Sequence, residues 1–94
     1  MSIIWSDAAD KDLDAIEAFI EIDNPFAAGR VHEYILDAVT LLEQQPMMGR
    51  VGRVARTREL VVPGTPYIVA YTINKPHIVI LSVIHGARKW PDAI

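Results

Sequence analysis

The hydrophobic spacing of this chain changes once, at Pro46, and that change limits the possible folds more than any other feature. Before Pro46, apolar residues recur every three or four positions, which is the period of an amphipathic helix. After it, short runs of β-branched and aromatic residues are separated by proline, glycine and asparagine, as in strands joined by turns. A helical half followed by a strand half predicts an α+β fold in two layers, with the helices on one face of a largely antiparallel sheet.

Local signals divide the two halves into elements. A short apolar run at 2–5 predicts an initial strand, and Ser6 is a favourable N-cap for a helix that ends near Asp23. Asn24 and Pro25 then start a second helix, which Pro46 closes, so the two helices form a hairpin. Strands are expected at 57–62, 67–73 and 77–84, as a three-strand antiparallel meander. The 94 residues fit a single domain, 1–94.

The last of these strands is apolar on both faces. Strict alternation would direct Val79, Leu81 and Val83 to one side of the sheet and the isoleucines at 78, 80 and 84 to the other. In a two-layer fold the face away from the helices is expected to be partly polar. Either a loop or tail of the chain itself covers that second face, or a partner chain does.

Composition excludes several classes of function. The chain has no cysteine, and therefore no disulfide, thiolate nucleophile or cysteine zinc site. It has no phosphate-binding loop, no dinucleotide-binding glycine pattern and no cluster of metal-ligand residues, so we expect neither cofactor nor metal. The first residues have no basic segment, and no apolar run approaches the length of a membrane span. We therefore expect a cytoplasmic protein that does not enter a membrane.

Charge is distributed unevenly along the chain, whose net charge is −3. Residues 1–46 carry ten acidic and two basic side chains, and residues 47–94 carry seven basic and two acidic ones, which gives −8 and +5. The second half therefore presents a basic surface that could receive an acidic partner. The glycine-containing loop carries three arginines, Arg50, Arg53 and Arg56. Like charges do not stabilise one another, so we expect an anionic partner to bind at this loop.

Three segments of the chain together resemble the ParE branch of the RelE/ParE toxins of bacterial type II toxin–antitoxin systems. The resemblance covers essentially the whole chain, in the family's order and spacing. The first segment comprises Trp5-Ser6, Asp12-Leu13, Ile16, Asn24-Pro25 and Ala27-Ala28. The second comprises Gly49-Arg50-Val51-Gly52-Arg53-Val54, Thr57-Arg58-Glu59-Leu60-Val61 and Thr65 to Tyr71. The third is Val83-Ile84-His85-Gly86-Ala87-Arg88-Lys89-Trp90-Pro91.

The resemblance implies a growth-inhibiting toxin that a cognate antitoxin neutralises in a hetero-oligomeric complex. Such modules act under stress or after plasmid loss, as plasmid stabilization systems. ParE-like members are DNA gyrase inhibitors with no demonstrated catalytic residue, whereas RelE-like members cut mRNA on the ribosome. Whether this chain is an enzyme depends on which branch it follows. A third possibility is an inactive relative that only binds its antitoxin.

The RelE-like chemistry needs a general base, an acid and cations on the scissile phosphate. The candidate catalytic residues for it are Arg58, His85 and Arg88. However, the strand at 67–73 opens with Tyr67-Ile68-Val69, where the ribonuclease branch typically carries an arginine, and the net charge is acidic. These departures favour the gyrase-directed, ParE-like branch.

The residues expected to bind antitoxin or target each have a structural alternative. Arg58 could form only a strand charge pair with Glu59, and His85 could be a hydrogen-bonded structural residue. Arg88 could stack on Trp90 and hold the tail to the body of the protein. The full set of predicted binding residues is Arg50, Arg53, Arg56, Arg58, Arg88, Lys89 and Trp90.

Overall fold

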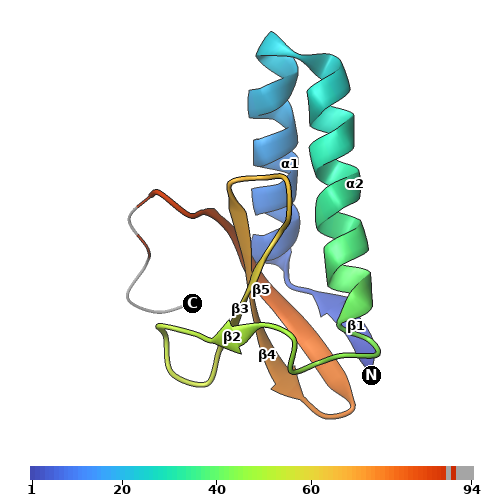
Figure 1. Ribbon diagram of the computed structural model, residues 1–94, viewed down its shortest axis with the longest axis vertical. Helices are drawn as coiled ribbons and strands as arrows, with labels where there is room; N and C mark the ends of the chain where they lie inside the picture. Colours follow the sequence, from blue (N-terminus) through green and yellow to red (C-terminus); the bar gives the residue numbers. More distant parts are fainter. Residues whose placement is uncertain (89, 91–94) are drawn as a thin grey trace.

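A computed structural model describes residues 1–88 and 90 of the chain. Two antiparallel helices stand side by side, and their connected ends extend past the edge of a five-stranded sheet (Figure 1). The elements, in chain order, are β1 (Ser2–Trp5), α1 (Asp7–Asp23), α2 (Pro25–Leu41), β2 (Arg50–Val51), β3 (Arg58–Val61), β4 (Tyr67–Asn74) and β5 (His77–His85). The α+β class, the initial strand, the helical hairpin and the later strands are confirmed.

Both predicted helix caps are present. The Ser6 hydroxyl accepts a hydrogen bond from the Ala9 N–H at 3.1 Å, and the Asn24 side chain accepts one from the Ala27 N–H at 3.1 Å. The second helix ends at Leu41, well before Pro46. Proline disfavours helical conformation in the residue before it and clashes with the preceding turn, so the chain passes through turns before reaching Pro46.

The sheet is mixed rather than purely antiparallel. Its strand order is β1-β5-β4-β3-β2, and the β3–β4–β5 meander is antiparallel as predicted. β1 instead lies parallel to β5, with Ser2 opposite His77 and Trp5 opposite Ile80. The two-residue strand β2 lies within the expected loop, where Arg50 faces Glu59 in antiparallel register. Two residues carry too little apolar alternation to be recognised as a strand from sequence.

The face assignment of β5 differs from strict alternation. The pairing register between β4 and β5 shifts at Ala70 and Tyr71, so that Ala70 faces Ser82 and Tyr71 faces Ile80. A bulge of this kind reverses the side-chain alternation beyond it. Val83, predicted to lie with Val79, is therefore buried in the core together with Ile80.

The core lies between the helical hairpin and one face of the sheet. Its largest fully buried side chains come from α2 and the segment after it, from the residue after β3, and from β4 and β5: Ile35, Leu42, Val62, Val69, Tyr71, Ile78 and Ile80.

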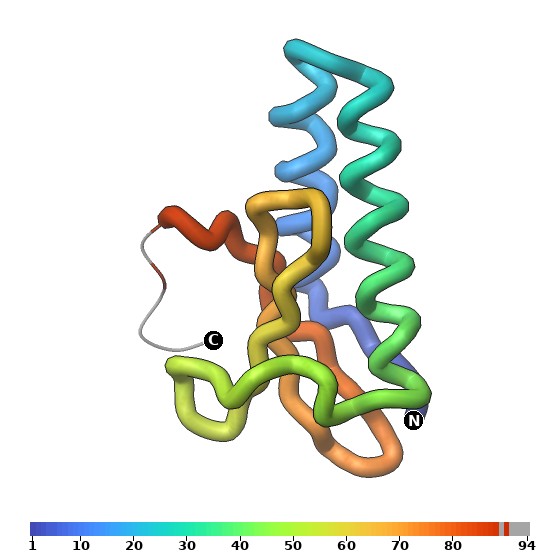
Figure 2. The backbone as a smooth tube through the Cα atoms, viewed as in Figure 1, coloured from blue at the N-terminus to red at the C-terminus, as the bar shows by residue number. Residues whose placement is uncertain are grey.

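The opposite face is covered in part by the chain itself. Ala70 of β4 is fully buried, and the loop before β3 binds this face through the Thr72 hydroxyl, which donates to the Arg56 carbonyl at 2.8 Å. The loop follows β2, and its course is clearest as a tube (Figure 2). Covering by the chain thus accounts for part of the apolar second face, while Val61 remains half exposed.

Candidate partner-binding site

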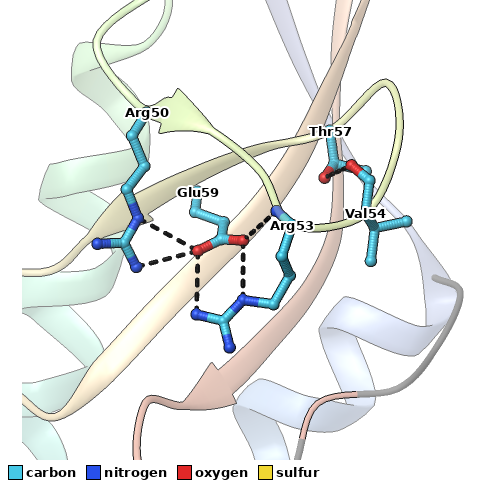
Figure 3. A network of polar contacts seen from close by, with 5 residues as sticks. All are labelled: Arg50, Arg53, Val54, Thr57 and Glu59. Atoms are coloured by element: carbon cyan, nitrogen blue, oxygen red, sulfur yellow. Dashed lines mark hydrogen bonds and ion pairs between the residues drawn. The ribbon is translucent and has the colours of Figure 1, made fainter.

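The basic half of the chain is organised around one buried carboxylate. Glu59, on β3, has a side chain only 2% exposed and accepts hydrogen bonds from two arginines (Figure 3). Arg50 donates through Nε and Nη2 to Oε1 at 3.2 and 3.0 Å. Arg53 donates through its backbone N–H to Oε2 at 2.8 Å, and through its guanidinium to both oxygens. Five donors therefore converge on one carboxylate.

The surroundings of Glu59 favour its charged form. Burial alone would raise the pKa of this carboxyl group. The hydrogen bonds from the backbone and side chain of Arg53, together with those from Arg50, outweigh burial and hold the pKa below its ordinary value of 4.5. Glu59 is therefore a fixed negative charge at neutral pH, and it orients both guanidiniums.

This arrangement corrects two sequence-based expectations. Glu59 does not pair with its neighbour Arg58, because alternation along β3 directs the two side chains to opposite faces. It pairs instead with Arg50, which lies directly opposite on β2, and with Arg53 just beyond that strand. The anionic partner expected for the arginine loop is therefore, for Arg50 and Arg53, the chain's own Glu59. Of the three loop arginines, Arg56 is the one that Glu59 does not bind.

Arg58 is occupied with the backbone of the preceding loop. Its Nη1 donates to the Gly49 carbonyl at 2.7 Å and lies 3.5 Å from the Met47 carbonyl. Beside it, the Tyr71 hydroxyl accepts from the Gly49 N–H at 2.9 Å and donates to the Pro46 carbonyl at 2.7 Å. Burial raises the pKa of Tyr71, so its hydroxyl stays protonated and keeps this donor. Both side chains hold the loop from 46 to 50 against the sheet.

The loop that carries Arg56 is closed by its own hydrogen bonds. Gly52 donates its N–H to the Thr57 carbonyl at 2.8 Å, and the Thr57 hydroxyl donates to the Val54 carbonyl at 2.7 Å. A Cβ on Gly52 would collide with Thr57, which is why a residue without a side chain is needed there. Arg56 has a φ of 65°, in the left-handed region.

The C-terminal segment meets this cluster through Trp90. The Arg53 guanidinium carbon lies 3.8 Å from the centre of the Trp90 ring, which is a cation–π contact. The sequence left open a contact between Trp90 and Arg88, and the cation–π contact in the structure is instead with Arg53. Arg88 is exposed. The predicted binding residue Lys89 lies outside the described residues.

A groove of about 620 Å³ lies between α1 and the end of β5. Apolar side chains form much of its wall, and Phe19 is 62% exposed there. Asp12 accepts hydrogen bonds from the Ser82 hydroxyl at 2.7 Å and the Val83 N–H at 2.9 Å. The main groove-lining residues are Asp12, Ile16, Phe19, Ile84, His85 and Arg88.

The three ribonuclease candidates do not form one cluster. His85 and Arg88 line the groove together, and His85 accepts a hydrogen bond from the Ala87 N–H at 3.1 Å through Nδ1. Arg58 pairs across to Tyr71, whereas His85 pairs across to Tyr67. Those two tyrosines are four residues apart on β4, or about 13 Å at the ~3.3 Å rise of a strand. Arg58 is not among the residues that line the groove, and its Nη1 donates instead to the Gly49 carbonyl at 2.7 Å.

The described part of the chain lacks two other kinds of site. Within residues 1–88 and 90, no three histidine or carboxylate side chains are grouped so that they could hold a metal ion. No helix in the same ranges is both long and apolar enough to cross a membrane. The distinctive features are therefore the arginine cluster around Glu59 and the groove beside α1.

The sequence and the fold of the chain match one family of proteins. Residues 3–90 match the model of the family described as ParE toxin of type II toxin–antitoxin system, parDE. The chain belongs to this ParE toxin family, within the RelE/ParE superfamily, as its sequence motifs indicated.

Individual relatives are similar over nearly the full length. The chain is 44% identical to the provisionally named toxin Y4kP of Sinorhizobium fredii over 98% of this chain and 95% of that protein. It is 34% identical to Toxin RelE2 of Caulobacter vibrioides, covering 92% and 96%. A solved structure of the chromosomal ParDE system from P. aeruginosa superimposes with a TM-score of 0.84 at 27% identity, over 90% of this chain and 95% of that one.

Proposed function

We propose that this ParE-family toxin inhibits DNA gyrase and that a cognate antitoxin protein neutralises it in a hetero-oligomeric complex. The observation that carries the proposal is the match to the ParE family over residues 3–90. The engagement of Arg58 with the Gly49 carbonyl, outside the groove that His85 lines, supports it, because metal-free RNA cleavage needs its cations and its proton-transfer groups around one phosphate. Gyrase inhibition needs surface complementarity and no catalytic group on the toxin. The proposed target lies in the cytoplasm, so we place the toxin there.

The antitoxin is proposed to occupy the groove and to reach the arginine cluster. Phe19 and Ile84 offer apolar surface in the groove, and Arg88 adds a positive charge at its end. An amphipathic or extended segment of an antitoxin could bury this apolar surface, as other helix-in-groove complexes do. Acidic residues of the same partner would face the basic side chains of the second half of the chain.

The direct test is a supercoiling assay with purified gyrase. We expect the toxin to inhibit supercoiling and to trap cleaved DNA, and an equimolar amount of the neighbouring gene's product to restore activity. In cells, induction of the toxin should produce filaments with DNA damage, and co-expression of the neighbour should relieve the arrest. Normal supercoiling at stoichiometric excess of folded toxin would contradict the proposal.

A RelE-like, ribosome-dependent ribonuclease is the second candidate. It is favoured by the 34% identity to Toxin RelE2 and by the presence of His85 and Arg88 in one groove. It predicts mRNA cut at the ribosomal A site, mapped by primer extension, and loss of cutting in Arg88→Ala. The control is Arg30→Gln, which changes an exposed arginine on α2.

The third candidate is an inactive relative that acts only as an antitoxin-binding module. It predicts soluble expression without growth arrest, together with a stable complex with the neighbouring gene's product. Growth arrest that this product relieves would exclude it.

A further inference from the structure

We propose that Arg56 is a dedicated contact residue for a carboxylate of an acidic, partly apolar peptide segment. The inference rests on the proposed function, because the antitoxin is the source of that segment. It goes beyond it by assigning the contact to one of the arginines of the second half and by stating the chemistry of the partner.

Arg56 differs from its neighbouring arginines in having no partner for its charge within residues 1–88 and 90. Arg50 and Arg53 share the carboxylate of Glu59, and Arg58 binds backbone carbonyls. Within residues 1–88 and 90, no hydrogen bond or ion pair involves the Arg56 guanidinium, and the residue is exposed. Its positive charge is therefore open to a ligand, whereas the neighbouring guanidiniums would have to be shared between a ligand and Glu59.

The backbone that presents Arg56 is held by hydrogen bonds. The Arg56 carbonyl accepts from the Thr72 hydroxyl of β4 at 2.8 Å. Thr57, the next residue, donates its N–H to the Val54 carbonyl at 3.2 Å and accepts from Gly52 at 2.8 Å. The backbone is thus held through the Arg56 carbonyl and through the next residue, so that a guanidinium there loses less freedom on binding than one on a mobile loop.

The backbone conformation of Arg56 is strained. With φ at 65°, Arg56 has a conformation that residues other than glycine, asparagine and aspartate rarely adopt. Glycine or asparagine would satisfy this turn better, so the turn itself does not explain an arginine. Strain of this type is characteristic of residues whose side chains bind ligands. The side chain of Arg56, rather than its backbone, is what a partner would recognise.

The surroundings of Arg56 favour a peptide over a nucleic acid. The adjacent Ala55 is exposed, and Val51, on the strand leading into the loop, is 78% exposed. A peptide with an acidic residue flanked by apolar ones would satisfy the charge and cover these side chains. A phosphate backbone would leave these apolar side chains in water.

The test compares wild type, Arg56→Gly and the control Arg30→Gln. Each protein is titrated by calorimetry with the purified product of the neighbouring gene, at low and moderate salt, and separately with a short DNA duplex. Thermal unfolding is measured for the free proteins. We expect Arg56→Gly to bind the protein partner about tenfold more weakly, which is the loss of one charge-assisted hydrogen bond. Its Tm should equal or exceed that of wild type, because glycine relieves the strain.

Each other outcome is decisive. Unchanged affinity of Arg56→Gly, with wild type and Arg30→Gln binding tightly, would overturn the role of Arg56 and leave the proposed function standing. A loss of affinity for the DNA duplex alone would overturn it in favour of a nucleic-acid contact. Equal weakening in Arg30→Gln would show that only net charge matters. A folded wild-type toxin that does not bind the neighbouring gene's product would contradict the inference and the proposed function together.

Discussion

Replacement of Glu59 by glutamine tests the organisation of the basic cluster. The change preserves the size of the side chain and removes its charge. One carboxylate oxygen becomes an NH₂ group, which faces donors from Arg50 or Arg53 where an acceptor is needed. The variant therefore loses charge-assisted hydrogen bonds and leaves at least one buried donor opposite another donor.

The expected loss of stability follows from the geometry. Breaking a fully buried ion pair costs about 3–5 kcal/mol. The side chains of Arg50 and Arg53 are 55% and 46% exposed, so water compensates for part of the loss. We therefore expect Glu59→Gln to lower the free energy of unfolding by about 2–3 kcal/mol. At ~4–8 °C per kcal/mol for a domain of this size, Tm falls by about 10–20 °C.

The effect should also depend on pH. The pKa of Glu59 is lower in the folded state than its ordinary value of 4.5, so its contribution is fully present above that value. The contribution is lost as pH falls through the folded-state pKa. The difference in Tm between wild type and Glu59→Gln should therefore be largest at pH 7 and should shrink below pH 4.5.

Thermal unfolding followed by circular dichroism between neutral and acidic pH measures both effects. The matched control is Glu21→Gln, an exposed glutamate on α1, which should leave Tm close to that of wild type. If Glu59→Gln unfolds at the wild-type temperature at pH 7, then the carboxylate does not hold the loop, and the reasoning is refuted.

Three further variants probe the contacts around the site. Tyr71→Phe leaves the buried Gly49 N–H without its acceptor and should cost about 1–3 kcal/mol in urea unfolding, whereas an unchanged midpoint would show that water replaces the phenol. Asp12→Ala removes the acceptor of the Val83 N–H, so we expect it to lower the free energy of unfolding by about 1–2 kcal/mol and to speed amide exchange at Val83. Unaltered exchange would argue against this hydrogen bond. Leu42→Ala creates a cavity in the core and should cost about 2–5 kcal/mol, with full two-state unfolding retained.

The elements that could be predicted from sequence are those with local signals. The caps at Ser6 and Asn24 and the change of period at Pro46 are properties of neighbouring residues, so the helices and the meander were predictable. The partner of β1 was not, because its register with β5 joins residues far apart in the chain. The bulge that places Val83 in the core could not be predicted either, because strict alternation along β5 assigns Val83 to the face of the sheet away from Ile80.

The candidate site was predictable in composition but not in its internal pairing. Arg50, Arg53 and Arg56 were recognised as a basic loop, yet the role of Glu59 depends on a two-residue strand that brings it opposite Arg50. The available signal is a single acidic residue, Glu59, in a basic stretch, and adjacency in the sequence suggests Arg58 as its partner. Sequence neighbours on a strand face away from each other, so the cross-strand residue was the better candidate.

The parallel pairing of β1 with β5 also affects how this protein is made. The first strand cannot pair with β5 until His77, which lies opposite Ser2, has been synthesised. At ~5–20 residues per second of bacterial synthesis, that delay is about 4–15 s for the intervening chain. The helical hairpin emerges early, with its sheet-facing side still uncovered. A chain that stops before β5 therefore lacks the strand that joins β1 to β4, and β1 has no partner in the sheet.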